Sequence, residues 1–261
     1  AITAYISAYA RISNYRHEPL SKAPGISEKL MSITGISYLI DAITRFSVSQ
    51  LYQDPKCTLV PGITKVQTTE LSRQLVQDAM EIQGHKAFCL GPKNRIAQAY
   101  QRLMDEMSMG ERNSIIRSQF ITEQTIAYHP HYIAIQNALI ESHPSVGLKQ
   151  MDRHYLASLG HLASNHIRAW FLSLTHGRCH WHTPDYCQSH FQALARLSSA
   201  YALLLDVCLR LFQSTLSHQK ISARLADCLS SLYVLSALLR NGLSVSALSM
   251  PHRIQPPGYF R

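Results

Sequence analysis

The chain has 261 residues, of which 46% are hydrophobic and only 16% are charged, so it is long enough to form one or two well-packed cores. Lys and Arg number 25 against 16 Asp and Glu, a formal net charge of +9, which favours an acidic partner. The basic residues are scattered singly, without the basic runs and aromatic platforms of a nucleic-acid surface, so a dedicated nucleic-acid site is not expected.

Helical periodicity, interrupted by Pro and Gly, predicts an all-α protein built as an antiparallel helical bundle. No strand pair is expected. The tail from residue 241 is Pro-rich and is interpreted as an extended arm. The expected helices, in chain order, cover residues 1–17, 25–52, 62–83, 92–104, 112–126, 130–141, 150–176, 185–216 and 219–240.

The three helices expected after residue 150 carry the strongest pattern, with apolar residues every three or four positions. Such a stripe is typical of a helix face that packs into a bundle. Because the helices before residues 141–144 are more often interrupted, we expect a domain boundary there. The expected parts are a four-helix bundle (1–141), a helical extension (142–240) and the arm (241–261). In the first long helix the stripe consists of Leu156, Leu159, Ala163, Ile167, Trp170 and Leu174.

The six cysteines and the apolar runs are used to predict where in the cell the protein is found. Free cysteines spread along apolar stripes are typical of a reducing environment. Asp206 and Arg210 interrupt the longest apolar run, so no membrane span is expected. The N-terminus lacks the pattern of a signal peptide, and because it begins with Ala, we expect that residues upstream have been removed or left out. We therefore expect a cytoplasmic protein that reaches the cytoplasmic face of the inner membrane only through partners.

Several motifs resemble the large, FadE-type bacterial acyl-CoA dehydrogenases of fatty-acid β-oxidation. The agreement runs from the start to about residue 240. It implies a C-terminal four-helix bundle that supports FAD and acyl-CoA, followed by additional helices. The family's N-terminal helical domain and middle β-domain would precede residue 1, and nothing in this chain corresponds to them. The motifs include Asp78-Ala79-Met80-Glu81-Ile82, Leu90-Gly91-Pro92-Lys93-Asn94, Ala99-Tyr100-Gln101, His129-Pro130, Gly160-His161-Leu162-Ala163-Ser164-Asn165 and Ile221-Ser222-Ala223-Arg224-Leu225.

The resemblance implies a carboxylate base in a Glu-Gly step before the helix that contains Asn113 and Arg117. Register places Gly110 at the Glu position and Glu111 at the Gly position. Since misplacing a catalytic group by about 1 Å can cost about 10²-fold in rate, Glu111 is a poor substitute. Its other interpretation is a solvated acid at a helix N-terminus, where the helix dipole favours it. Some members carry the base on the first helix, but residues 1–17 contain no Asp or Glu.

The resemblance also implies flavin contacts, which are altered here. An Arg-Gln-Phe stretch of the family aligns with Asn14-Tyr15-Arg16, and a Gly-Gly pair aligns with Gly84-His85. Only Gly permits close backbone approach to a cofactor, so an imidazole at His85 removes that contact. We therefore expect no catalytic residue and no cofactor, with Arg16, Gly84 and His85 as remnant positions. FAD is the alternative cofactor.

The richest cluster of metal-ligating residue types lies between residues 176 and 190. Thiolates and imidazoles suit Zn²⁺, and a site there would use Cys179, His180, His182 and Cys187. The spacing fits no standard zinc finger, and a solvated loop joining two helices is the other interpretation. His129-Pro130-His131 is assigned a structural role.

Three functions follow from these observations. The first is a non-catalytic scaffold or adaptor that binds protein partners in a bacterial multiprotein assembly, such as a secretion or regulatory complex, with self-association left open. The second is the C-terminal half of a flavin-dependent acyl-CoA dehydrogenase. The third is a zinc-dependent binding module that uses the 176–190 cluster.

Overall fold

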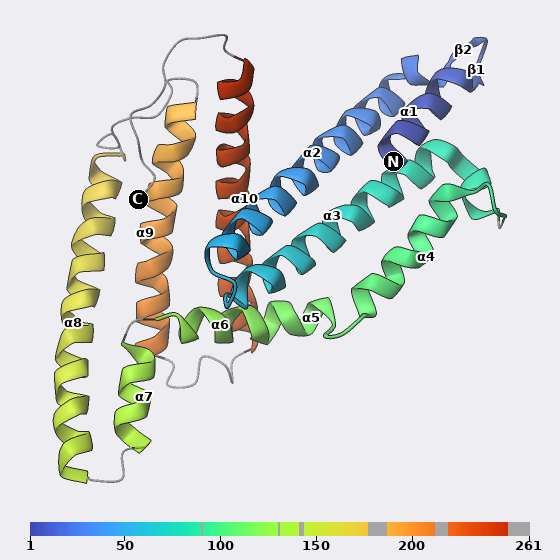
Figure 1. The fold of residues 1–261 in the computed structure, drawn as a ribbon. Coiled ribbons are helices and arrows are strands. Elements are labelled where there is room, and N and C mark those ends of the chain that lie inside the picture. The colour runs from blue at the N-terminus through green and yellow to red at the C-terminus, as the bar shows by residue number, and fades with distance from the viewer. Residues whose placement is uncertain (90, 130, 141–143, 177–186, 212–218, 250–261) are drawn as a thin grey trace.

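The computed structural model describes residues 1–89, 91–129, 131–140, 144–176, 187–211 and 219–249 (Figure 1). Within these ranges the chain is almost entirely helical, which confirms the all-α prediction. Two groups of helices stand apart in Figure 1, and α10 lies between them.

The first group, called here the N-terminal lobe, consists of α1 to α4. Helices α2 and α3 lie side by side, and α1 and α4 pack on α3 (Figure 1). Their shared core is aliphatic, with Ile6, Ile33 and Ile96 fully buried. The bounds of the lobe are α1 Ile2–Ile12, η1 Leu20–Lys22, α2 Pro24–Gln53, α3 Leu59–Gln83, η2 Gly84–Phe88 and α4 Arg95–Ser108.

Local sequence explains where these helices begin and end. Pro24 is the first residue of α2, a position at which a missing N–H costs nothing. The side chain of Asn94 caps α4 by accepting a hydrogen bond from the Ala97 N–H over 3.2 Å. Gly84 ends α3 with a φ of +69°, which a residue with a side chain rarely adopts.

A small hairpin corrects the predicted first helix. Helix α1 ends at Ile12, and β1 (Asn14–Tyr15) pairs with β2 (Glu18–Pro19) in antiparallel register. Arg16 and His17 form the turn with φ values of 49° and 70°. Proline lacks the N–H that a helix requires and restricts the residue before it, so Pro19 opposes continuation of the helix. The prediction that the chain contains no strand pair is therefore wrong for this short element.

A single helical run crosses from the N-terminal lobe to the second group. It consists of α5 (Asn113–Ile115), the π-helical η3 (Ile116–Phe120) and α6 (Ile121–Ala127). Gly62 of α3 allows this run to approach closely, because a Cβ there would lie 2.8 Å from Cε1 of Phe120. The absence of a side chain at residue 62 thus sets the contact between α3 and η3.

The second group, called here the C-terminal lobe, consists of α7 to α9. Helix α8 packs on both α7 and α9. Helix α8 begins six residues before its predicted start. Helix α10 continues to residue 249, where the described chain ends. Residues 241–249 are therefore helical, although an extended arm is predicted there. A glycine inside a helix lowers stability by about 1 kcal/mol relative to alanine. Gly242 nevertheless does not end α10, because the apolar periodicity continues beyond it. The bounds are α7 Tyr132–Ile140, α8 Pro144–Leu174, α9 Gln188–Leu211 and α10 Gln219–Ser249.

Helix α10 joins the two lobes. Its Asp227 forms a two-point ion pair with Arg117 of η3, and the buried Thr122 hydroxyl of α6 donates to the Ser222 carbonyl over 2.9 Å. On α2, the Ser47 hydroxyl lies 2.7 Å from the Tyr233 hydroxyl. The two predicted parts, 1–141 and 142–240, therefore share contacts and a core cluster that includes side chains from both.

Two helical stretches, Gln188–Arg210 and Gln219–Leu243, are long and apolar enough to cross a membrane by length and composition alone. The core helix of a soluble protein can pass the same test. Here α9 packs on α8 and α10, and α10 packs on α2, η3 and α9. The expectation that the chain has no membrane span stays a prediction.

Candidate functional site

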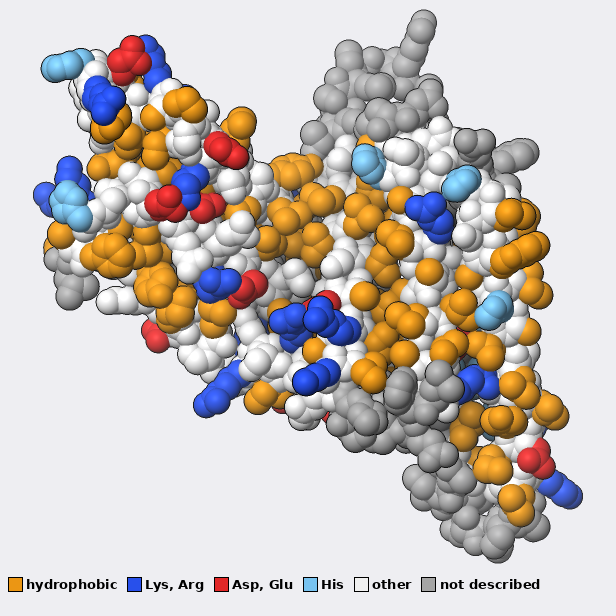
Figure 2. All heavy atoms as spheres, turned by 180° about the vertical axis from the view of Figure 1, so that it is seen from behind, with side chains coloured by type: hydrophobic (Ala, Val, Ile, Leu, Met, Phe, Trp, Pro, Cys, Tyr) orange, Lys and Arg blue, Asp and Glu red, His pale blue; other side chains and the backbone are white. Residues whose placement is uncertain are grey.

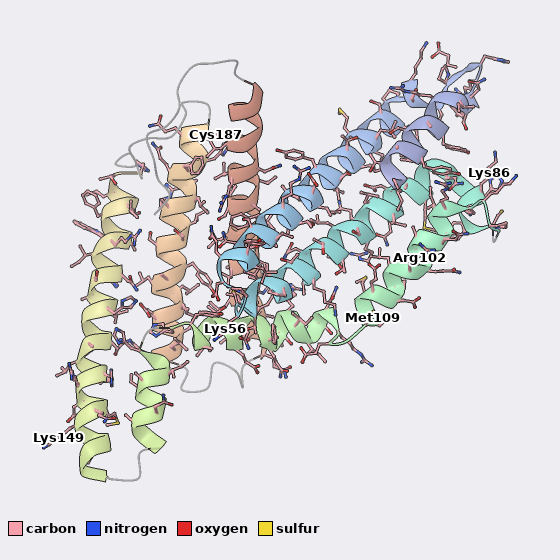
Figure 3. All side chains as sticks on the ribbon, in the orientation of Figure 1. Lys56, Lys86, Arg102, Met109, Lys149 and Cys187 are labelled. Carbon is pink, nitrogen blue, oxygen red and sulfur yellow. The ribbon has the colours of Figure 1, made fainter. Side chains whose placement is uncertain are left out.

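The loop that aligns with the family's catalytic base is held by a lysine. Lys65 Nζ donates hydrogen bonds to the carbonyl oxygens of Met109 over 2.6 Å and Glu111 over 2.7 Å. Between them, Gly110 has a φ of +69° and is exposed, as is Glu111. Figure 3 shows Met109 at the end of α4, where this loop begins. A glutamate at position 110 would be strained in this backbone conformation.

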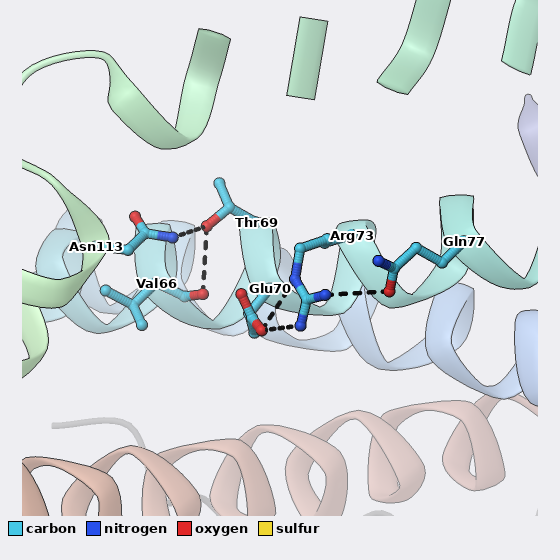
Figure 4. Close-up of polar contacts among 6 residues, drawn as sticks. All are labelled: Val66, Thr69, Glu70, Arg73, Gln77 and Asn113. Carbon is cyan, nitrogen blue, oxygen red and sulfur yellow. Dashed lines mark hydrogen bonds and ion pairs between the residues drawn. The ribbon is translucent and has the colours of Figure 1, made fainter. Parts of the chain in front are cut away.

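The helix after this loop is anchored on α3 by a polar contact (Figure 4). Asn113 Nδ2 donates to Thr69 Oγ1 over 2.8 Å, while Asn113 Oδ1 is buried with no hydrogen-bond partner within the described chain. One turn further along α3, Arg73 pairs with Glu70 and donates to Gln77 Oε1 over 3.0 Å. The Asn113–Thr69 contact holds the start of α5 against α3, the Arg73 contacts lie within α3, and the Glu111 side chain takes part in neither.

The positions that align with flavin contacts lie at the other end of α3. Arg16 is exposed in the β1–β2 turn, with its guanidinium 5.3 Å from the centroid of the Tyr15 ring. His85 is exposed directly after Gly84. Since α3 rises about 1.5 Å per residue, Gly84 lies roughly 28 Å along the helix from Lys65 and the loop that it holds. Gly84 also borders an open groove that includes Met80, Phe88 and Tyr100.

The predicted zinc cluster can be located only in part. Cys187 is half-buried next to the start of α9 (Figure 3) and is a free cysteine. Cys179, His180 and His182 lie outside the described residues, so the structure does not test this set of ligands.

A different cluster of histidines and one aspartate lies in the C-terminal lobe. His129 Nε2 lies 2.6 Å from Asp206 Oδ1, and these side chains are 12% and 5% exposed. Asn165 Nδ2 donates to Asp206 Oδ2 over 2.8 Å. His161 completes a group whose ligand atoms, one each from His129, His161 and Asp206, all lie within 4.8 Å of one another. The three elements that meet here are the α6–α7 loop, α8 and α9.

His131 lies beside this group. Its ring centroid is 5.6 Å from that of His161 and 6.4 Å from that of His129. Burial and the neighbouring His161 and His129 lower the pKa of His131. This environment favours a neutral imidazole, the form in which histidine binds metals.

The sequence alone predicts a structural role for His129 and His131, and it shows Asp206 as a charge that interrupts an apolar run. His161 and Asn165 are four residues apart, so they lie on one face of α8. That face is the one turned towards α9, because His161 and Asn165 are half-buried while Leu156 and Ile167 are exposed.

The apolar stripe of α8 faces away from the bundle. Leu156, Ile167 and Leu174 have exposed fractions of 67–68%, and Trp170 is equally open. The prediction that this stripe packs into the bundle is wrong, because the less exposed face of α8, which carries His161 and Asn165 as well as Leu162, is the one turned towards α9. Arg210 on α9 illustrates this, since its Nη2 donates to the Ser158 carbonyl over 2.8 Å.

The region that contains the histidines, Asp206 and the exposed stripe of α8 matches a known protein family. Residues 126–242 match the family described as acyl-CoA dehydrogenase, C-terminal, bacterial type. Over these residues the chain is similar to that family. The matched acyl-CoA dehydrogenase C-terminal segment runs from α6 into α10 and contains His129, His161 and Asp206 as well as the exposed stripe of α8.

Proposed function

We propose that this chain is a non-catalytic scaffold or adaptor derived from an acyl-CoA dehydrogenase, which binds a partner protein in a bacterial multiprotein assembly. The observation that carries the proposal is the exposed apolar face of α8. Soluble proteins rarely leave large contiguous apolar patches uncovered, and such patches mark interaction sites. A secretion or regulatory complex is the proposed context.

The shape of this face suits a partner helix. Gly160, Ala163 and Ser164 line a shallow depression together with Ile167 and Phe171. Small residues at the middle of a helix face let a second helix approach closely, while large residues at its edges fill the grooves of that helix. Leu156 lies before the depression and Trp170 lies beside its far end, both exposed.

The charges around the stripe favour an acidic partner. Lys149, Arg153 and Arg168 are exposed on α8, against one exposed acid, Asp152. Lys149 points away from the bundle in Figure 3. A second copy of the chain would bring these like charges together, which disfavours self-association through this face. We therefore propose an amphipathic helix with acidic flanks, supplied by another protein.

The altered enzyme positions support a non-catalytic role. Gly110 occupies the aligned base position in a conformation that glycine favours, and Glu111 is exposed and contributes only its carbonyl to Lys65. Arg16 lies in an exposed turn, and the His85 imidazole stands where the family has a second glycine. These residues do not fit a flavin contact as the family makes it, and chemistry depends on the site more than on the fold.

A visible absorbance spectrum of the untagged protein tests the loss of flavin chemistry. We expect no flavin bands, either as purified or after gel filtration from excess FAD. Approximately one flavin per chain would overturn the proposal. It would support the alternative, the C-terminal half of a flavin-dependent acyl-CoA dehydrogenase, with Glu111 as the residue to replace.

Site-specific photo-crosslinking in bacteria tests the docking face. A benzoylphenylalanine at position 167 is expected to crosslink one recurrent protein through an acid-flanked helix, and the same probe at position 52, on the exposed Tyr52 of α2, is not. A synthetic peptide of the crosslinked helix should bind the purified chain, and Ile167→Glu should abolish binding. Arg168→Glu should weaken it several-fold, more strongly at low salt.

Three results would overturn the docking proposal. Crosslinks from position 167 only to a second copy of the chain would make α8 a self-association face. Flotation with anionic lipid vesicles that is lost in Trp170→Ala would make it a membrane-binding face. Equal crosslinking from positions 52 and 167 would show that α8 has no preferred partner.

A further inference from the structure

We propose that His129, His161 and Asp206 form a binding site for one divalent transition-metal ion of the zinc type. The three side chains are 32 to 77 positions apart in the sequence, and the fold brings their ligand atoms within 4.8 Å of one another. Two imidazoles and one carboxylate are a donor set that zinc and neighbouring divalent metals accept. This site is distinct from the 176–190 loop.

The charge of Asp206 supports a cation at this position. Its carboxylate is 5% exposed, and the only ion-pair partner that the described residues give it is His129. No Lys or Arg of the described chain pairs with it. A buried carboxylate is costly unless it is paired or coordinates a metal, and a divalent ion between Asp206 and the imidazoles would neutralise it.

Asn165 positions the carboxylate. Its amide donates to Oδ2 of Asp206 over 2.8 Å, which leaves Oδ1 directed at His129. Hydrogen bonds of this type orient the ligands in metal sites and increase affinity. Asn165 lies four residues after His161 on α8, so the same helix supplies one ligand and the group that orients another.

Binding requires the His129–Asp206 pair to open slightly and the third ligand atom, within 4.8 Å of the other two, to move closer. Metal–ligand bonds of about 2.0–2.2 Å place tetrahedral ligand atoms roughly 3.3 Å apart. The His129 Nε2 to Asp206 Oδ1 distance is 2.6 Å, a hydrogen bond that metal coordination by both atoms would replace. Side-chain rotation of His161 brings in the third ligand, and the neighbouring His131 is the group that could supply a fourth nitrogen.

The metal would connect the α6–α7 loop, α8 and α9, which share few buried aliphatic side chains. Among the residues that the structure describes, the core cluster that includes α9 has Leu205, Cys208 and Leu225 as its buried members, and the last of these belongs to α10. A metal that binds the folded state and not the unfolded one stabilises the fold in proportion to its occupancy. We therefore expect the ion to fix α8 in the lobe.

Calorimetric titration of the untagged chain, first freed of metal with a chelator, tests the site with ZnCl₂ as the probe. We expect one zinc ion per chain and an increase in Tm. His161→Ala should weaken binding at least tenfold while the protein stays folded, since His161 is only half-buried. The matched control, His166→Ala, lies five residues later on the same helix, is exposed and is outside the ligand set, so it should bind as the wild type does.

Cobalt(II) distinguishes this site from the predicted cysteine-containing one. We expect visible d–d absorption without a thiolate-to-cobalt charge-transfer band, and no effect of Cys187→Ser. No stoichiometric zinc or cobalt binding, or wild-type affinity in His161→Ala, would overturn the proposal. Loss of binding in Cys187→Ser would place the metal in the 176–190 loop instead. Each result is independent of whether a partner docks on α8.

Discussion

In the N-terminal lobe, α2 and α3 bury aliphatic side chains such as Ile33, Val76 and Ala79. In the C-terminal lobe, the side chains buried on α8 and α9 include Ser158 and Asp206, while large apolar residues of α8 face solvent. Figure 2 views the surface of the molecule from behind. Charged side chains gather mainly over the N-terminal lobe and the middle of the molecule, and hydrophobic side chains line the outer edge of the C-terminal lobe.

This difference separates a lobe with an ordinary aliphatic core from the lobe for which we propose a binding role. A lobe with apolar side chains inside and charges outside satisfies the ordinary rules of folding. The C-terminal lobe departs from those rules on α8, where large apolar side chains are exposed, and at the buried Asp206, and such departures concentrate at functional sites. These departures lie within the segment that matches the acyl-CoA dehydrogenase C-terminal family, so the proposed docking face and the proposed metal site both belong to it.

The largest expected effect is the difference in lost stability between replacing a buried isoleucine and replacing an exposed one. Ile33→Ala removes a fully buried side chain and should lower the free energy of unfolding by about 2–5 kcal/mol. Ile167→Ala, at a side chain that is 68% exposed, should change it by less than about 0.5 kcal/mol. Urea unfolding of both variants measures the difference. Similar losses would mean that the α8 stripe is already covered in the isolated chain.

The next effect compares two glycines within helices. Gly62→Ala places a Cβ 2.8 Å from the Phe120 ring and should cost about 1–3 kcal/mol, because the α3–η3 contact must open. Gly35→Ala, on α2 with no atom within 4 Å of the added Cβ, should gain about 0.5–1 kcal/mol. Opposite signs in thermal unfolding are the expected result. A neutral Gly62→Ala would show that η3 moves without cost.

A smaller effect is expected where α10 joins the N-terminal lobe. Tyr233→Phe removes a hydroxyl that lies 2.7 Å from Ser47 Oγ, and should cost about 0.5–1.5 kcal/mol. Tyr38→Phe, at an exposed tyrosine of α2, serves as the control and should have no measurable effect. An equal response of the two variants in urea unfolding would contradict this role of the Ser47–Tyr233 contact.

The smallest expected effect is a decrease in the free energy of unfolding at alkaline pH. Burial raises the pKa of Tyr201 and that of Tyr233 above the unfolded value of about 10. A raised folded pKa contributes stability that is complete below pH 10 and is lost as the pH rises through the folded pKa. The free energy of unfolding should therefore fall above about pH 10, and less steeply in Tyr201→Phe than in the wild type. Identical slopes in the two proteins would count against this contribution.

Much of the secondary structure was predictable because its causes are local. The 3.6-residue periodicity and the Pro and Gly positions located α2, α3 and α9 within a few residues. The hairpin at Arg16 and His17 was missed because two non-glycine residues adopt positive φ values there. The extension of α10 was missed because Asn241 and Gly242 resemble a helix end, although the apolar pattern continues beyond them.

The sequence by itself determined that the protein is helical, which helices are amphipathic and which family the chain resembles, since periodicity and motifs are properties of short segments. Only the tertiary structure decided what each amphipathic face meets. Periodicity shows that one face of α8 is apolar, but the packing of α8 on α9 through His161, Asn165 and Ser158 turned that face outward. The same packing placed His129 beside Asp206, 77 residues away. Contacts at that separation depend on the arrangement of whole helices, which no local pattern records.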